Sequence, residues 1–262
     1  MAELFADERR DQIAELIAVR GRVRIAELVA QFGVTDPTIR KDLAALEERN
    51  VLKRTHGGAI AQRQIVSRDL PGRAGVAVEE KKAIAQACLE LIADGDTVFL
   101  DSGTTIEQLA LALVERRRTD GNAPRVTALT NSLAVIQAVA ETPGIEHVGL
   151  GGRFRPVGGT FVGPLTIQTV ERFTPQTAFI SVSGLTADGI TVVDLDEAQL
   201  KAAVIERAGQ VVVAADHSKL GAIDFAPVCP LSEIDIIVTD RTNPELEALC
   251  ATADVRLAVA LV

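Results

Sequence analysis

A short polar turn between an apolar run and an amphipathic run is the first place in this sequence where chemistry could occur. The stretch VFLDSGTTIEQLA runs from Val98 to Ala110, and its middle is Asp101-Ser102-Gly103-Thr104-Thr105. A strand, a hydroxyl-rich turn and a helix start together present backbone N–H groups that suit a phosphate. The Asp101 carboxylate could act there as a catalyst, although Asp101 or Ser102 could equally serve only to cap the helix.

The turn lacks the two common signatures of nucleotide binding. It has neither the Gly-Lys-Ser/Thr ending of a P-loop nor the three-glycine fingerprint of dinucleotide-binding proteins. The sequence therefore indicates an anionic ligand such as a phosphate without specifying a nucleotide.

Small or charged residues also follow five other apolar runs. Ligands of open α/β sheets bind at the carboxyl ends of the strands, so we expect these clusters to share one polar pocket. The clusters are Thr130-Asn131-Ser132, Gly151-Gly152, Ser183-Gly184, Asp216-His217-Ser218-Lys219 and Thr239-Asp240. Lys219 could neutralise a phosphate or simply be solvated. Glu197 and Lys201 lie four residues apart on a predicted helix, where they could line the pocket or form an ordinary surface ion pair.

The alternation of short apolar runs with amphipathic segments from about residue 78 onwards predicts an α/β fold. Runs such as TVFL, VTALT and VVVAA are typical of strands in a mostly parallel sheet that is covered on both faces. The glycine-rich stretch from Gly151 to Pro164 interrupts this alternation and predicts a hairpin or flap.

The first 60 residues have the pattern of a winged helix-turn-helix. Three segments with helical apolar spacing are followed by a short strand, VLKR, and a turn, THGGA. Gly33 is expected to end the second helix, and Asp36 before Pro37 is a good cap for the third. Arg40 and Lys41 would lie on the exposed face of that third helix, where they could contact DNA or only be solvated.

The periodicity predicts a winged helix-turn-helix domain over residues 1–60, a linker without clear periodicity over 61–76 and an α/β domain over 77–262. The formal net charge of the chain is −9. Residues 1–75 nevertheless hold 13 Lys and Arg against 11 Asp and Glu, whereas the remainder holds 14 against 25. This asymmetry indicates two modules with different partners. Because the first module is only weakly basic, its pattern rather than its charge favours DNA.

Several other classes of protein are excluded. The chain is 47% hydrophobic and 24% charged, which is an ordinary globular balance. It has no apolar run of membrane-spanning length and no stretch of signal-peptide type at its start. Cys88, Cys229 and Cys250 are widely spaced and accompanied by only three histidines, which argues against a disulfide framework or a zinc site. We therefore expect a cytoplasmic protein with no membrane segment, metal or cofactor.

The order of motifs along the chain resembles the DeoR family of bacterial transcriptional regulators. VTDPTIRKDLAALEERNVLKRTHGGA, from Val34 to Ala59, is similar to the family's N-terminal signature. KKAIAQACLELIADGDTVFLDSGTT, LTNSLAVIQ, GLGGRF, AFISVSGLTADGIT, DEAQLKAA and AADHSKLG are similar to its sensor domain in order and spacing. The resemblance implies a winged helix-turn-helix joined to a Rossmann-like α/β sensor domain similar to ribose-5-phosphate isomerase. It also implies repression of sugar-metabolism genes under the control of a phosphorylated sugar or related metabolite.

Carried over by position, the resemblance also implies functional residues. The DNA-facing set comprises Thr35, Thr38, Arg40, Lys41, Arg54 and His56. The effector-binding set comprises Asp101, Ser102, Gly103, Thr104, Thr105, Asn131, Gly152, Gly184, Glu197, Lys201 and Lys219. Two departures concern the DNA-binding helix. Arg40-Lys41 stands where two arginines are usual, and a lysine cannot form the bidentate fork of an arginine. Asp36-Pro37 after Thr35 leaves either Thr35 or Asp36 as the helix cap.

Three hypotheses follow. The first is an effector-responsive repressor that acts on a double-stranded DNA operator as a homo-oligomer, either a dimer or a tetramer. The second is a sugar-phosphate isomerase-like enzyme with an accessory DNA-binding module, in which Asp101, Glu197 and Lys201 would supply the reacting groups. The third is an activator that responds to the same ligand. We favour the repressor and expect no catalytic residues.

Overall fold

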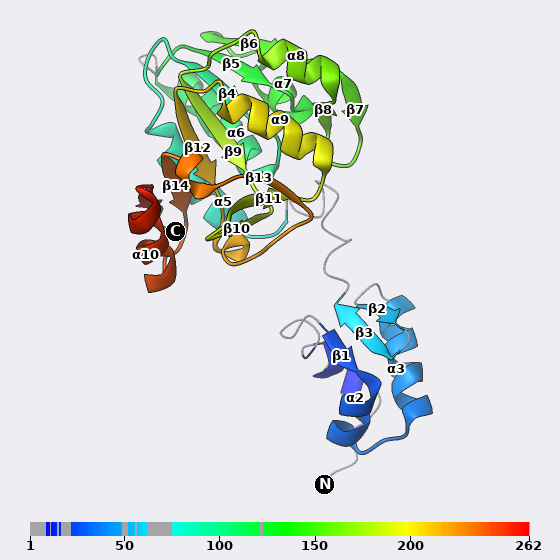
Figure 1. Ribbon diagram of the computed structural model, residues 1–262. Helices are drawn as coiled ribbons and strands as arrows, with labels where there is room; N and C mark the ends of the chain where they lie inside the picture. The colour runs from blue at the N-terminus through cyan, green and yellow to red at the C-terminus, as the bar shows by residue number, and fades with distance from the viewer. Residues whose placement is uncertain are drawn as a thin grey trace. The chain divides into compact units, whose positions relative to one another are not determined.

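The computed structural model describes residues 9–10, 12–14, 16, 22–48, 52–55, 57–61, 75–120 and 123–261. The chain divides into two compact units, Met1–Asp69 and Leu70–Val262, which are described separately (Figure 1). Most of the expected linker, residues 62–74, lies outside the described residues. The domain boundaries of the sequence analysis therefore stay predictions.

The first unit is a winged helix-turn-helix, as its pattern predicts. The described residues between 9 and 16 are helical, and they precede five elements that form a three-stranded antiparallel sheet in the order β1-β3-β2 and two helices. The elements are β1 (Arg22–Arg24), α2 (Ile25–Phe32), α3 (Asp36–Glu48), β2 (Leu52–Thr55) and β3 (Gly58–Ala61). The apolar faces meet in a core of their own that includes Ile13, Leu28, Ile39, Leu43 and Leu52. The β2–β3 hairpin is the predicted wing.

The turn between α2 and α3 follows the expected chemistry with a shift of one residue. Gly33 ends α2 with a left-handed φ of 65°, and its N–H donates to the Val29 carbonyl, as predicted. α3 begins at Asp36 itself, so Thr35 rather than Asp36 takes the capping position, and the Thr35 carbonyl accepts from the Thr38 and Ile39 N–H groups. Pro37 occupies the first turn, where its missing N–H removes no helical hydrogen bond.

Two ion pairs involve α3. Asp36 pairs with Arg40 one turn later, and both side chains are about half exposed. By contrast, the Asp42 side chain is only 2% exposed and accepts from Arg9 at 2.7 Å and from Arg10 at 3.1 Å. A buried carboxylate needs such partners to offset the loss of hydration, so the Asp42 cluster fastens the first helical segment to α3.

The second unit is built on a seven-stranded, wholly parallel sheet. Its strands are β4 (Thr97–Leu100), β5 (Val126–Thr130), β6 (Ile145–Gly149), β9 (Thr177–Ser181), β12 (Gln210–Ala214), β14 (Ile236–Thr239) and β15 (Arg256–Val259). They lie in the order β15-β14-β12-β9-β4-β5-β6. This arrangement confirms the α/β fold class predicted from the sequence.

Helices cover both faces of this sheet, which is why its strands are apolar throughout. α5 (Val78–Leu89), α6 (Thr104–Thr119) and α7 (Leu133–Val139) share one core with the strand residues that include Val98 and Leu100. α8 (Pro164–Val170), α9 (Leu195–Ile205) and α10 (Pro244–Ala253) share the other core with residues that include Phe99. Figure 1 shows α9 across the near face of the sheet.

The strand order reverses between β4 and β9. From β4 the chain adds β5 and β6 on one side, then returns to place β9, β12, β14 and β15 on the other side. In parallel sheets of this kind the crevice at the carboxyl ends of the two strands beside the reversal is the usual ligand site. The DSGTT turn follows β4 and therefore lies at that point.

Smaller elements surround the same edge of the sheet. The glycine-rich stretch forms the predicted flap, a hairpin of β7 (Arg153–Arg155) and β8 (Thr160–Val162). A three-stranded antiparallel sheet of β10 (Gly184–Thr186), β11 (Gly189–Val192) and β13 (Ala226–Cys229) was not expected from the sequence. No helix in the described part of the chain combines the length and apolar character that a bilayer crossing requires.

Packing explains the glycine at position 184. A Cβ added to Gly184 would lie 2.2 Å from the backbone oxygen of Ala222, whereas one added to Gly151 would meet nothing within 4 Å. We expect Gly184→Ala to destabilise the protein by about 1–3 kcal/mol, which is typical of overpacking. Gly151→Ala is the control and should leave the unfolding midpoint unchanged in chemical denaturation. Equal midpoints for the two variants would contradict the packing role.

Candidate functional site

A buried polar cluster joins the ends of β4 and β9 at the reversal of strand order. The Asp101 side chain is 1% exposed, and its Oδ2 accepts from the Ser181 N–H at 2.9 Å and forms an ion pair with Lys201. The Ser181 hydroxyl lies 3.0 Å from the same Oδ2 and 2.7 Å from the Ser102 carbonyl, so its one proton can serve either acceptor. Asp101 is thus a structural acceptor that holds two strand ends and a helix together.

This cluster corrects one interpretation of the DSGTT turn. α6 begins at Thr104, its capping residue is Gly103 with φ 98°, and the cap makes no side-chain hydrogen bond. Neither Asp101 nor Ser102 therefore caps the helix. The first N–H groups of α6 have no carbonyl partner within the helix, and this is the arrangement that suits an anion.

α9 brings Glu197 and Lys201 to the same edge of the sheet. The N-cap residue Asp194 accepts from the Glu197 N–H at 3.2 Å, which fixes the start of the helix. Lys201, one turn further on, is 3% exposed and points to Asp101. The two residues share a face, as their spacing predicts. The interpretation as an ordinary surface pair is nevertheless wrong, because Lys201 is buried and each residue has a different ion-pair partner.

The flap supplies the partner of Glu197. Arg155 Nη1 lies 2.6 Å from Glu197 Oε1, and Arg155 Nε lies 3.1 Å from Asp194 Oδ2. The Arg155 side chain is 16% exposed, so most of its surface is covered in this arrangement. The hairpin is therefore fastened to the first turn of α9 by charge.

Backbone hydrogen bonds fasten the other side of the flap to the turn after β5. The Phe161 N–H donates to the Asn131 carbonyl at 2.8 Å, and the Leu133 N–H donates to the Gly159 carbonyl at 2.9 Å. The Asn131 side chain adds a bond from Nδ2 to the Phe161 carbonyl. Its Oδ1 is buried, with no hydrogen-bond donor among the residues that the structure describes.

A pocket opens between the strand ends, α9 and the flap. It encloses about 320 Å³, including space open to solvent. Its lining combines four residues of the predicted effector set with hydroxyl, glycine and valine residues that were not in that set. The lining residues are Ser102, Gly103, Gly158, Ser181, Val182, Ser183, Val192, Glu197 and Lys201.

Charge in the pocket is largely paired. Lys201 is held by Asp101, and Arg155 by Glu197 and Asp194. Burial raises the pKa of Glu197 above its ordinary value of 4.5, an effect opposed by the positive charges of Lys201 and Arg155 and reinforced by the nearby carboxylates. In such a pocket the Glu197 carboxylate can accept hydrogen bonds from hydroxyl groups, and the N-terminus of α6 can bind an anion.

The other predicted effector residues do not line this pocket. Thr104 and Thr105 are buried in the first turn of α6. A Cβ on Gly152 would lie 2.0 Å from Thr166 Oγ1, so a glycine is required there by packing against α8. Gly184 packs against Ala222, as described above. Lys219 lies in a short 3-10 helix, 4.0 Å from Asp216.

Ser181, Ser183, Arg155 and Gly158 are pocket or partner residues that were missing from the predicted site set. Ser183 lies in one of the polar clusters noted in the sequence. Ser181 is the last residue of a buried strand, and Arg155 stands in a glycine-rich stretch. Ser181 is identified by its position at the reversal of strand order, and Arg155 and Gly158 by the position of the flap beside α9.

The predicted DNA-facing residues lie on α3 and the wing. Thr35, Arg40 and Lys41 are exposed and Thr38 is half-buried, with Thr35 Oγ1 and Thr38 Oγ1 2.9 Å apart. His56 and the side chain of Arg54 lie outside the described residues.

Comparison with known proteins decides the family. The sequence model of the DeoR-like helix-turn-helix domain matches residues 9–64, and that of the DeoR C-terminal sensor domain matches residues 76–241. The chain belongs to the DeoR family. DeoR-family relatives include the HTH-type transcriptional repressor GlcR of Bacillus subtilis, which is 33% identical over 91% of this chain and 90% of its own length. The Escherichia coli glycerol-3-phosphate regulon repressor is 32% identical over 90% of this chain and 92% of its own.

One further repressor and one solved structure are also similar to this chain. The lactose phosphotransferase system repressor of Staphylococcus epidermidis is 32% identical over 91% of this DeoR-family chain and 93% of its own length. Among solved structures, ribose 5-phosphate isomerase A from Methanocaldococcus jannaschii is similar, with 18% identity, a TM-score of 0.41 and coverage of 55% of each chain.

The raised pKa of Glu197 gives a test of its burial. The folded protein binds this proton more tightly than the unfolded chain, so stability falls as pH rises from about 4.5 through the folded pKa. In Glu197→Gln this loss disappears. We therefore expect the unfolding free energy of the variant, relative to wild type, to increase with pH over that window. Chemical denaturation at several pH values measures the difference, with exposed Glu206→Gln as control. Parallel curves for wild type and Glu197→Gln would contradict the burial effect.

Proposed function

We propose that this DeoR-family protein is a transcriptional repressor of sugar-metabolism genes whose operator affinity is modulated by a phosphorylated sugar or related metabolite. The observation that carries the proposal is the combination, in one chain, of a winged helix-turn-helix and a polar pocket at the strand-order reversal of an α/β unit. The names of the relatives support it, because they are repressors of a glycerol-3-phosphate regulon and of a lactose phosphotransferase system.

In this proposal, the exposed face of α3 contacts DNA. Arg40 and Lys41 would bind base edges and phosphates, while Thr35 and Thr38 would lie at the N-terminal end of the helix, which commonly contacts base edges. Arg54 and His56 would belong to the wing. One weakly basic module grips DNA poorly, so the protein would act as a dimer or tetramer on paired half-sites in the cytoplasm.

The effector would bind with its phosphate at the start of α6 and its hydroxyl groups towards Glu197. The proposed phosphate site is the Ser102–Gly103–Thr104–Thr105 turn. There the phosphate would accept from the backbone N–H groups at the start of the helix rather than from the buried side chains of Thr104 and Thr105. Asp101 and Lys201 would form its floor, and Asn131, Gly152, Gly184 and Lys219 would shape the surrounding loops. Binding would favour one arrangement of the DNA-binding modules over another.

The enzyme alternative is not favoured. The relatives are repressors, and Asp101, the first candidate for a catalytic base, already accepts from Ser181 and Lys201. Incubation of the purified protein with pentose and hexose phosphates tests this directly. Turnover that disappears in Glu197→Gln would support the enzyme alternative. Increased transcription when the protein binds its operator would instead indicate an activator.

The proposed DNA contact can be tested at Lys41. We expect Lys41→Ala to weaken operator binding and to reduce the slope of log affinity against log salt by about one, as for the loss of one phosphate contact. Fluorescence anisotropy with DNA from the protein's own upstream region, against a scrambled duplex, measures both quantities. Arg256→Ala, an exposed arginine of the sensor unit, is the control. Equal affinity of wild type for the two duplexes would reject the proposal.

The proposed effector site can be tested at Gly103. A Cβ at Gly103 would lie 2.9 Å from Ser181 Oγ, at a φ of +98° that side chains rarely adopt. We expect Gly103→Val to lose the thermal shift produced by sugar phosphates while keeping operator affinity. For wild type, a ligand at about 100 times its Kd should stabilise by about 2.7 kcal/mol. The screen uses glycerol 3-phosphate, glucose 6-phosphate and ribose 5-phosphate.

Gly95→Val is the matched control, because Gly95 has a similar φ of +87° but open space around its Cβ position. A Gly103→Val protein that keeps its full ligand-induced shift would show that the turn does not bind the effector.

A further inference from the structure

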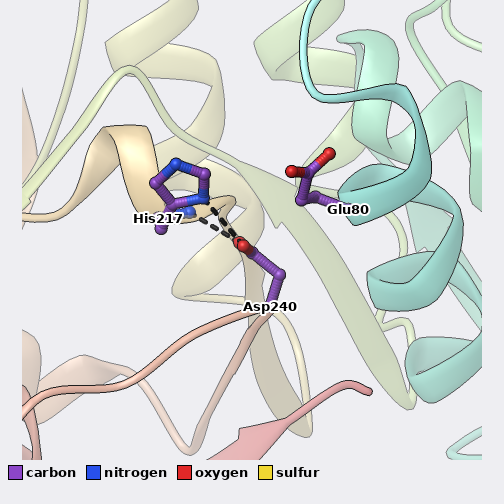
Figure 2. Close-up of side chains that lie close together, drawn as sticks. All are labelled: Glu80, His217 and Asp240. Atoms are coloured by element: carbon purple, nitrogen blue, oxygen red, sulfur yellow. Dashed lines mark hydrogen bonds and ion pairs between the residues drawn. The ribbon is translucent and has the colours of Figure 1, made fainter. Parts of the chain in front are cut away.

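A second cluster of side chains lies at the carboxyl edge of the sheet, and none of its members lines the pocket. His217 follows β12 in the short 3-10 helix, Asp240 follows β14, and Glu80 lies in the first turn of α5. β12 and β14 are adjacent parallel strands, so their ends bring His217 and Asp240 together. Figure 2 shows Glu80 approaching this pair from α5.

The donor atoms of the three residues converge. One ligand-type atom from each residue lies within 4.8 Å of the other two. Asp240 holds His217 twice, because its Oδ1 accepts from the His217 N–H at 2.7 Å and its Oδ2 lies 2.7 Å from the ring Nδ1. The Asp240 side chain is fully buried, whereas the His217 side chain is 38% exposed. The cluster therefore has a buried carboxylate, Asp240, on one side and a solvent-exposed imidazole, His217, on the other.

We propose that Glu80, His217 and Asp240 bind a divalent transition metal ion, with Zn²⁺ as the best match. Imidazole nitrogen and carboxylate oxygen are both ligand types of this ion, and three protein ligands with water in the fourth position is the usual arrangement of an open zinc site. Ligand atoms about 2.1 Å from a tetrahedral zinc ion lie about 3.4 Å apart. The donor atoms lie within 4.8 Å of one another, and His217 Nδ1 lies 2.7 Å from Asp240 Oδ2. An ion bound between these atoms would replace the proton that they share.

A His–Asp hydrogen bond alone explains only two of the three residues. Glu80 comes from a different element and adds a second carboxylate beside one imidazole. Arg241 offsets part of this charge, with Nε 3.5 Å from Asp240 Oδ2 and Nη2 3.9 Å from Glu80 Oε1. Its side chain is 66% exposed, so it can leave when a metal ion enters. Arg241 is thus a resident competitor for the metal ion.

The expectation of no metal rested on the numbers of cysteine and histidine residues. These numbers cannot reveal a site in which carboxylate oxygens supply most of the ligands. Metal binding would join the first turn of α5 to the ends of β12 and β14. α5 is the first described helix after residues 62–74, so the ion would strengthen the part of the sensor unit where the chain enters it. Metal binding at these three residues would not depend on DNA or effector binding.

Calorimetric titration of the chelator-treated, untagged full chain with Zn²⁺ tests the site, and Co²⁺ provides a visible absorption band that reports coordination. We expect one ion per chain, with Mg²⁺ binding much more weakly because imidazole favours transition metals. His217→Ala and Glu80→Gln should each weaken Zn²⁺ binding at least tenfold. Both side chains are partly exposed, so these variants should fold.

Two matched variants sharpen the result. Exposed His147→Ala removes a histidine from β6 and should bind Zn²⁺ as wild type does. Arg241→Ala removes the competing cation and should bind Zn²⁺ more tightly. Equal Zn²⁺ affinity for wild type and His217→Ala, or for wild type and Glu80→Gln, would overturn the three-residue site.

Discussion

The buried ion pair between Asp101 and Lys201 is the interaction on which the sensor unit depends. It joins β4 to α9 across 100 residues of sequence, and the Ser181 N–H adds the end of β9 to the same carboxylate. Removal of one partner from such a pair typically costs about 3–5 kcal/mol, because a charge is left buried without compensation. The backbone ladder sets the register of β4 and β9, and the Asp101 carboxylate fastens the ends of both strands to α9 at the pocket.

A second layer of contacts is built on this base. Once α9 is fixed by Lys201, Glu197 is placed one turn earlier, where Arg155 of the flap reaches it. The flap in turn is bonded to the turn after β5. The wall of the pocket is thus a continuous series of contacts that runs from α9 through the flap to the turn after β5. In the proposed function, a ligand that displaces Arg155 from Glu197 would loosen the flap without disturbing the buried pair beneath it.

Much of this architecture could be predicted from the sequence, because a parallel sheet buried on both faces requires continuous apolar runs with polar residues at their ends. The sequence could not show which of the polar residues at the strand ends bind a ligand and which are needed for packing. Gly152 and Gly184 resembled ligand-binding glycines, but the Thr166 side chain and the Ala222 backbone leave no room for a Cβ at these positions. The spacing of Glu197 and Lys201 indicated a shared face, yet the burial of Lys201 depends on a carboxylate far away in the sequence. Ser181 and Arg155 carried no local signal. The role of Ser181 arises from the order of the strands, and that of Arg155 from the contact of the flap with α9.

In the proposed complex with DNA, the Asp36–Arg40 pair on α3 would affect discrimination among DNA sites. The Asp36 carboxylate pairs with the Arg40 guanidinium, so in this proposal it would take the place of a DNA phosphate in the free protein. In the proposed complex, every duplex must displace this carboxylate, and the displacement costs the same for all sequences. Non-specific binding, which consists mainly of phosphate contacts, loses a larger fraction of its free energy than specific binding does. An acidic residue beside the DNA-contacting arginine would then reduce the time spent on irrelevant DNA.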